Sequence, residues 1–174
     1  ENDAPNSTRT KPNPQDTQSD SVLGKIVYDM GGGHQLRATY EHMKESVDTN
    51  VLSGRAANPV ASTAVIDLQA QDEVKRDRAS LDWRYSGTGA VESAMLTGYW
   101  QQGRNRQASQ EDRLTAADRT RINTFDNRVW GFAGDVTLHF ATGALDHRLS
   151  AGGDLSFTRQ EGLRDGTVPT APDV

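Results

Sequence analysis

The sequence predicts an all-β protein, an antiparallel up-and-down meander of about six strands. Two observations predict this fold class. Apolar residues recur at every second position in six separate runs, which is the period of a strand whose two faces differ. The connections between these runs are alternately short and glycine-containing or long and polar, as expected for consecutive hairpins. Since only 34% of the 174 residues are hydrophobic, a thick core is not expected.

Composition narrows the function classes. The net charge of −5 argues against a nucleic-acid partner, because a phosphate backbone favours a basic surface. No stretch approaches the ~18 consecutive apolar residues of a transmembrane helix. The chain has no cysteine for disulfides, thiolate catalysis or thiolate-bound metals. Glu1 is not an initiator residue and no secretory leader opens the chain, so we expect a mature chain or a piece of a larger one.

A first hairpin is predicted at residues 18–28 and 34–45, after a polar loop at residues 1–17 that contains three prolines. In both strands every second residue is apolar or small, namely Val22, Gly24, Ile26 and Tyr28, then Leu36, Ala38 and Tyr40. The turn between the strands is rich in glycine, which tolerates positive φ, at Gly31, Gly32 and Gly33.

A second hairpin is predicted at residues 73–86 and 90–102, after a long polar loop at residues 46–72. The third strand alternates most regularly, with Ala79, Leu81, Trp83 and Tyr85 against Arg78, Ser80, Asp82 and Arg84. The fourth strand is less regular, and we expect its apolar face to carry Val91, Met95 and Tyr99.

A third hairpin is predicted at residues 124–141 and 147–160, between long polar loops at residues 103–123 and 161–174. Its apolar faces carry Trp130, Phe132, Gly134, Val136, Leu138 and Phe140, then Leu149, Ala151, Gly153, Leu155 and Phe157.

The alternation of connections places all short turns at one end of the sheet and all long loops at the other. Outer-membrane β-barrels are arranged in this way, with short periplasmic turns, long extracellular loops and strands of about 9–11 residues. Such barrels also place aromatic side chains in a girdle at each lipid interface. A soluble sandwich, the alternative, would concentrate its aromatics in mid-strand. The predicted girdle residues lie near strand ends: Tyr28, Tyr40, Trp83, Tyr85, Trp130, Phe132, Phe140 and Phe157.

The polar faces are too charged for a dry core, because an unpaired buried charge costs several kcal/mol. We expect a hydrated lumen instead. Six strands cannot close such a barrel, since the smallest have about eight, so we expect a fragment of a larger wall. The predicted lumen-facing residues are Lys25, Arg37, Glu41, Arg78, Asp82, Arg84, Asp135, Arg148 and Asp154.

Candidate ligand contacts are few. Of four histidines, His42 alone is expected near the outer end of the sheet; an interfacial or rim histidine is the favoured interpretation there, and a haem contact is the alternative. The arginine-rich residues 104–121 could attract the carboxylates of haem or of an acidic protein, but their own acidic neighbours partly neutralise them, and a solvated surface loop is the favoured interpretation. No metal-binding cluster, phosphate loop or nucleophile elbow is present, so no enzyme activity and no resident cofactor are expected.

The amino-acid sequence of several segments resembles that of the TonB-dependent outer-membrane receptors. The resemblance is greatest to the branch that takes up haem or binds haemoglobin, transferrin or lactoferrin. The resemblance covers essentially the whole chain, as an early-to-middle part of the barrel. It is carried by Asn13-Pro14-Gln15-Asp16, Ser21-Val22-Leu23-Gly24-Lys25-Ile26-Val27-Tyr28, His34-Gln35-Leu36-Arg37, Tyr40-Glu41 and Asp48-Thr49-Asn50-Val51-Leu52-Ser53.

This resemblance implies a 22-stranded barrel in the outer membrane of a Gram-negative bacterium, a plug inside the barrel, and contact with TonB through that plug. The implied partners are outer-membrane lipid, TonB, and haem or a haem-carrying protein as transported ligand. Phe-Arg-Ala-Pro and Asn-Pro-Asn-Leu boxes, which flank a haem-binding histidine in such receptors, are absent from these residues. A passive porin or an adhesin-like barrel is the alternative function.

Overall fold

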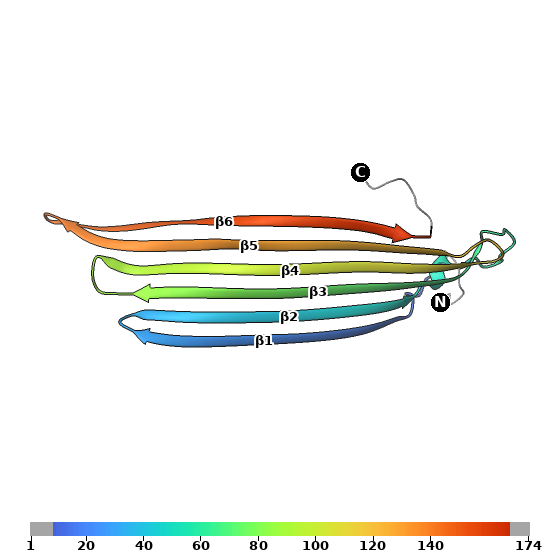
Figure 1. Ribbon diagram of the computed structural model, residues 1–174, viewed down its shortest axis with the longest axis horizontal. Helices are drawn as coiled ribbons and strands as arrows, with labels where there is room; N and C mark the ends of the chain where they lie inside the picture. The colour runs from blue at the N-terminus through green and yellow to red at the C-terminus, as the bar shows by residue number, and fades with distance from the viewer. Residues whose placement is uncertain (1–8, 168–174) are drawn as a thin grey trace.

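The computed structural model describes residues 9–167, which form one six-stranded antiparallel sheet (Figure 1). Each strand pairs only with its neighbours in the chain, so the predicted all-β meander of six strands is confirmed. The described part also contains one short 3-10 helix, η1 (Leu52–Gly54). The strands are β1 (Gln15–Gly31), β2 (His34–Asn50), β3 (Val65–Ser86), β4 (Val91–Arg113), β5 (Arg119–Thr142) and β6 (Leu145–Gly166).

Three tight turns gather at one end of the sheet, on the left of Figure 1. Gly32 and Gly33 connect β1 to β2 with φ of 61° and 83°, which glycine adopts without steric cost. Gly143, with φ of 60°, has the same role between β5 and β6. The connections from β2 to β3 and from β4 to β5 lie at the opposite end, which we call the loop end.

The strands extend further toward the loop end than the sequence predicts. The connection expected at residues 46–72 spans only 51–64, and that expected at 103–123 spans only 114–118. β6 continues to Gly166 and β1 begins at Gln15, so the predicted loops 161–174 and 1–17 are partly strand; residues 1–8 and 168–174 lie outside the described residues. Hydrophobic alternation does not predict these strand residues, because both faces of the sheet are polar near the loop end. The backbone hydrogen bonds between neighbouring strands nevertheless continue there.

The apolar face of β4 differs from the prediction. Leu96 lies directly across from Trp83 and Trp100 across from Ala79, so these side chains share the apolar face. Met95 and Tyr99 lie on the opposite face, and their predicted placement is wrong. The cause is a register shift: the pairing of β4 with β5 skips one residue of β4 after Val91. From there on, the residues that project from the apolar face are the even-numbered ones and no longer the odd-numbered ones.

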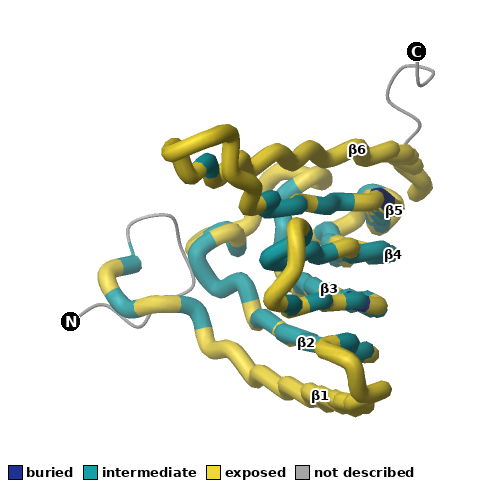
Figure 2. The backbone as a smooth tube through the Cα atoms, turned by 90° about the vertical axis from the view of Figure 1, so that its left-hand side faces the viewer, coloured by how far each residue is buried: buried dark blue, intermediate teal, exposed yellow. Residues whose placement is uncertain are grey.

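The sheet is a single layer, as the end-on view in Figure 2 shows. No hydrophobic residue of the described part is buried, and the only buried residues there are Asp82 and Gly131. Leu81 is 55% exposed and Phe132 is 52% exposed. A surface of this kind requires a covering partner or an apolar solvent, because burial of apolar area is the main driving force for folding.

Candidate functional site

One face of the sheet carries a continuous apolar band. Strand register fixes its membership, because residues directly across from each other in an antiparallel pair project from the same face. The band spans residues 79–85 of β3, about 20 Å along the strand, and residues 130–140 of β5, about 33 Å. Its aliphatic and small members are Val22, Gly24, Ile26, Leu36, Ala38, Ala79, Leu81, Ala94, Leu96, Gly98, Gly134, Val136, Leu138, Leu149, Ala151, Gly153 and Leu155.

An aromatic row closes the band toward the loop end. Tyr40, Trp100, Trp130 and Phe157 follow each other across the sheet from β2 to β6, interrupted only by Ala79 in β3. The rings of Trp130 and Phe157 stack with centroids 4.4 Å apart. We call this set the outer aromatic row.

A second aromatic group closes the band toward the tight turns. Trp83 and Tyr85 of β3 lie against His34, whose ring centroid is 5.7 Å and 4.7 Å from theirs. Phe140 of β5 stacks on His147 of β6 at 5.1 Å. All eight predicted girdle aromatics therefore project from the apolar face, at its two ends or next to them. Their position relative to a lipid bilayer stays a prediction.

The opposite face, which we call the polar face, carries all nine residues predicted to face a lumen. The register from β1 to β6 places them there: Lys25, Arg37, Glu41, Arg78, Asp82, Arg84, Asp135, Arg148 and Asp154. Whether water fills the space in front of this face stays a prediction.

The polar face contains one tightly bonded centre. Arg37 of β2 donates from Nε to Oδ2 of Asp82 at 2.7 Å, and Thr97 of β4 donates from Oγ1 to Oδ1 at 2.7 Å. Asp82 is only 4% exposed, and both carboxylate oxygens have a partner. A carboxylate buried at this depth requires such partners, because desolvating an unpaired charge is costly. The sequence reasoning missed Thr97 because it assigned the wrong face to β4.

Two further ion pairs cross the polar face. Arg76 binds Glu41, and Nη2 of Arg148 donates to Oε1 of Glu92 at 2.6 Å. The sequence analysis did not single out Arg76, although this residue lies two positions from Arg78 in the same strand and therefore on the same face. Lys25, Asp135 and Asp154 form no ion pair with any residue that the structure describes.

Most of the arginine-rich segment is strand, on either side of the connection at residues 114–118, and three of its arginines surround Glu111. Their guanidinium nitrogens lie 3.6 Å (Arg113), 3.7 Å (Arg119) and 4.0 Å (Arg121) from its carboxylate oxygens. Register places this group, the Glu111 cluster, on the polar face at the loop end. The Nε atoms of Arg113 and Arg119 are buried and have no hydrogen-bond partner within the described chain. The cluster carries a formal charge of +2.

His42 lies on the face of the apolar band, one step beyond the outer aromatic row. Its Nδ1 is 2.8 Å from Oδ1 of Asp77, which also accepts a 2.7 Å hydrogen bond from the hydroxyl of Tyr40. His34 and His147 lie near the tight turns, as predicted, and residues 9–167 contain no group of three potential metal ligands. The role of His42 as a haem contact stays a prediction.

Beyond the outer aromatic row, the same face becomes charged. Lys75 lies directly across from Lys44 and from Arg104, and Glu73 contacts both lysines, at 2.9 Å to Lys75 and 3.4 Å to Lys44. The hydrogen bond from Lys75, supported by Lys44, holds the pKa of Glu73 below its ordinary value. Asp126 binds Arg104 through both carboxylate oxygens and raises the pKa of that guanidinium.

Comparison with models of protein families gives no match for this sequence, and comparison with curated proteins gives no significant match. Among the described residues, no helix has the length and apolar character needed to cross a membrane. The fold and the geometry above therefore carry the functional argument.

Proposed function

We propose that this chain is part of the wall of a TonB-dependent receptor in the outer membrane of a Gram-negative bacterium, which takes up haem or another iron source. One observation carries the proposal. A single-layer sheet without a core presents an exposed apolar band between two aromatic groups on one face, and charged residues on the other. Lipid on the first face and water on the second satisfy both surfaces.

The dimensions of the band support lipid as its cover. Outer-membrane barrels present an apolar band about 25 Å tall to lipid, and the band here measures about 20–33 Å along its strands. A soluble protein would need a second apolar layer of matching area, and the described residues contain none. The aromatic residues also favour lipid, because Trp and Tyr prefer the boundary between hydrocarbon and water.

The polar face supports a water-filled interior. Asp82 is paired, whereas Lys25, Asp135 and Asp154 have no ionic partner in the described chain and require water or another segment. In the proposed receptor a plug occupies the interior, and TonB acts on the plug to admit the ligand. The residues of this chain line the passage and hold it open, and we assign them no covalent chemistry.

The Glu111 cluster supports an anionic ligand. It lies at the loop end of the polar face, which in the proposed orientation is the extracellular mouth of the barrel. Three guanidinium groups share one carboxylate, and two buried Nε atoms retain an unused donor. Arginine binds carboxylates well, and the propionates of haem supply two.

A paired substitution tests the membrane wall in the full protein that carries this sequence. Leu81→Arg places a charge in the middle of the apolar band, whereas Ser80→Arg places the same charge on the polar face. We expect Leu81→Arg to destabilise the protein folded in phospholipid vesicles, lowering its free energy of unfolding by about 2–4 kcal/mol. Ser80→Arg should lower it by less than about 1 kcal/mol. Urea titration of tryptophan fluorescence in vesicles measures both.

Equal effects of the two substitutions would contradict the assignment of the faces. Failure of the unmodified protein to float with vesicles would contradict the membrane wall itself. A plug and a TonB-contacting motif in the complete reading frame separate the receptor from a passive porin, which requires neither.

A further inference from the structure

A hollow of about 610 Å³ opens in the polar face of β4, β5 and β6, between the level of Asp82 and the Glu111 cluster. Small-molecule sites in proteins commonly measure about 300–1,000 Å³, so the hollow can hold a ligand of that class. Two consecutive rows of polar-face residues line it. They are Asn105, Phe125 and Gly162 in one row, and Gln107, Asn123 and Arg164 in the next. We call these six residues the amide hollow.

Four of these side chains have unused hydrogen-bonding capacity. Asn105, Gln107 and Asn123 form no side-chain hydrogen bond with any residue that the structure describes, and Arg164 forms neither a side-chain hydrogen bond nor an ion pair there. An amide both donates and accepts hydrogen bonds, as the hydroxyl groups of a sugar do. The guanidinium group of Arg164 can bind a carboxylate through two parallel hydrogen bonds.

Phe125 supplies an apolar surface between these polar groups. Its side chain is 46% exposed, and it lies between Asn105 and Gly162 in its row. A Cβ at position 162 would have no atom within 4 Å, so the space beside the ring is open on the side of β6. The C–H groups of a sugar ring form an apolar face, and contact with an aromatic ring removes that face from water.

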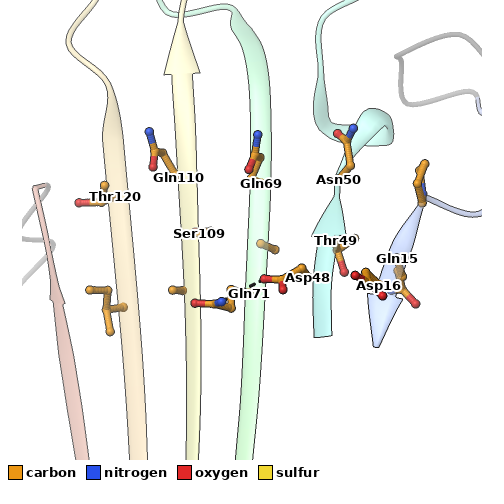
Figure 3. A pocket seen from close by; sticks show the side chains of 14 residues that line it. Gln15, Asp16, Asp48, Thr49, Asn50, Gln69, Gln71, Ser109, Gln110 and Thr120 are labelled. Carbon is orange, nitrogen blue, oxygen red and sulfur yellow. Dashed lines mark hydrogen bonds between the residues drawn. The ribbon is translucent and has the colours of Figure 1, made fainter. Parts of the chain in front are cut away.

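A larger hollow of about 720 Å³ at the loop end has a different character (Figure 3). Asn50, Gln69 and Gln110 lie side by side next to it, and each of these amides is bonded to a neighbouring side chain. No aromatic residue is among the described residues that line it. The amide hollow alone therefore combines unpartnered amides, an exposed aromatic ring and an unpartnered cation.

We propose that the amide hollow binds an acidic sugar. The apolar face of the sugar ring lies on Phe125, its hydroxyl groups bond the amides, and its carboxylate bonds Arg164. Arg164 is the only charged residue of the described chain that lines the hollow. On the polar face the nearest acid is Asp72 of β3, three strands and about 14 Å from Arg164, so the charge of this cation is not offset there.

This inference goes beyond the proposed function, which places a carboxylate ligand at the Glu111 cluster. It adds a second ligand class at a different hollow. It rests on one part of the proposed function, a water-filled space in front of the polar face.

The test measures binding of three probes to the full protein in lauryldimethylamine oxide, a detergent without a sugar headgroup. The probes are methyl glucuronide, methyl glucoside, which lacks the carboxylate, and cyclohexanecarboxylate, which lacks the hydroxyl groups. Saturation-transfer NMR titrations give a dissociation constant for each probe. The variants are Phe125→Leu and Arg164→Gln. Phe132→Leu on the apolar face and Arg78→Gln elsewhere on the polar face are their matched controls.

We expect the unmodified protein to bind methyl glucuronide about tenfold more tightly than either other probe, because a hydrogen bond to a charged group contributes about that factor. Arg164→Gln should lose the preference over methyl glucoside. Phe125→Leu should weaken the binding of both sugars about threefold or more, because the leucine side chain has no flat face for the sugar ring. Both controls should behave as the unmodified protein does.

Three results would overturn the inference. Absence of sugar binding, or equal binding of methyl glucuronide and cyclohexanecarboxylate, would exclude a sugar site. Equal binding of the two sugars would exclude the acidic sugar. Equal effects in the variants and in their controls would exclude the amide hollow as the place of binding.

Flotation with phospholipid vesicles separates this inference from the proposed function. Protein that floats with the vesicles but binds no sugar overturns the sugar site alone. Protein that does not float but binds methyl glucuronide in detergent overturns the membrane wall and supports the sugar site.

Discussion

At the scale of single residues, the sheet contains two kinds of ion pair. Asp82 is almost fully buried and is bonded on both oxygens, by Arg37 and by Thr97. The pair between Arg148 and Glu92 is open to solvent, with side chains 67% and 40% exposed. Coulombic attraction is screened in the second pair, whereas removing one partner from the first leaves a poorly hydrated charge.

We therefore expect Asp82→Ala to destabilise the protein far more than Glu92→Ala. The loss should be about 2–3 kcal/mol for Asp82→Ala, because Arg37 and Thr97 both lose a charge-assisted hydrogen bond. It should stay below about 1 kcal/mol for Glu92→Ala. Urea unfolding of the full protein in detergent measures both values. Similar losses would show that the burial of Asp82 does not strengthen its bonds.

At the scale of single elements, the tight turns fix the register of the hairpins. Gly33 has φ of 83°, and its carbonyl oxygen accepts a 2.9 Å hydrogen bond from the amide of Ser86 at the end of β3. The turn between β1 and β2 thus also holds the next strand in place. The turn at Gly143 has a similar φ but no atom within 4 Å of the position of a Cβ.

These two glycines allow a matched test of crowding at the first turn. Gly33→Ala would place its Cβ on the carbonyl oxygen of Ser86, so we expect a loss of about 2–4 kcal/mol. Gly143→Ala keeps the unfavourable positive φ and meets no neighbour, so we expect about 1 kcal/mol. Chemical unfolding midpoints of the two variants provide the comparison. Equal losses in the two variants would mean that crowding against the carbonyl oxygen of Ser86 does not contribute to the cost of Gly33→Ala.

The elements also show where the sequence is informative. Hydrophobic alternation predicts six strands and the face of residues such as Leu81 and Trp130, because apolar and polar side chains contrast strongly there. It fails past Gly103 in β4 and before Thr124 in β5, where both faces are polar and only the backbone ladder defines the strand. It also fails at Tyr99, since a register shift near Val91 leaves no mark in composition.

The candidate site was predictable to a similar extent. The alternation of charges placed Arg37 and Asp82 on one face, but only the strand register brings Thr97 to the same carboxylate. The Glu111 cluster was out of reach, because it requires β4 and β5 to continue where a loop was expected.

At the scale of the whole molecule, the sheet has two open edges within the described chain. β1 and β6 each pair on one side only, and every residue of β1 is exposed. An unpaired edge of this length favours association with another strand, and closed barrels remove such edges. In the proposed receptor, further strands pair with both.

Hydrogen exchange of the full protein in detergent tests this closure. We expect amides of β1 and β6 to exchange as slowly as those of β3 and β4, because each strand of a closed wall is hydrogen-bonded on both sides. Strands β3 and β4 serve as the internal control, since both are paired on two sides in the sheet. Rapid exchange at alternate residues of β1 alone would identify it as a true edge.

The meander topology also orders the assembly of the sheet in time. Each hairpin closes through a turn of a few residues, and such closures take about 1–10 μs. Joining β2 to β3 requires closure of residues 51–64, the longest connection within the described chain, and therefore costs the most chain entropy. Hairpins β1–β2, β3–β4 and β5–β6 are thus the natural early units, and the sheet grows by their stepwise docking, with β1–β2 joining its neighbour last.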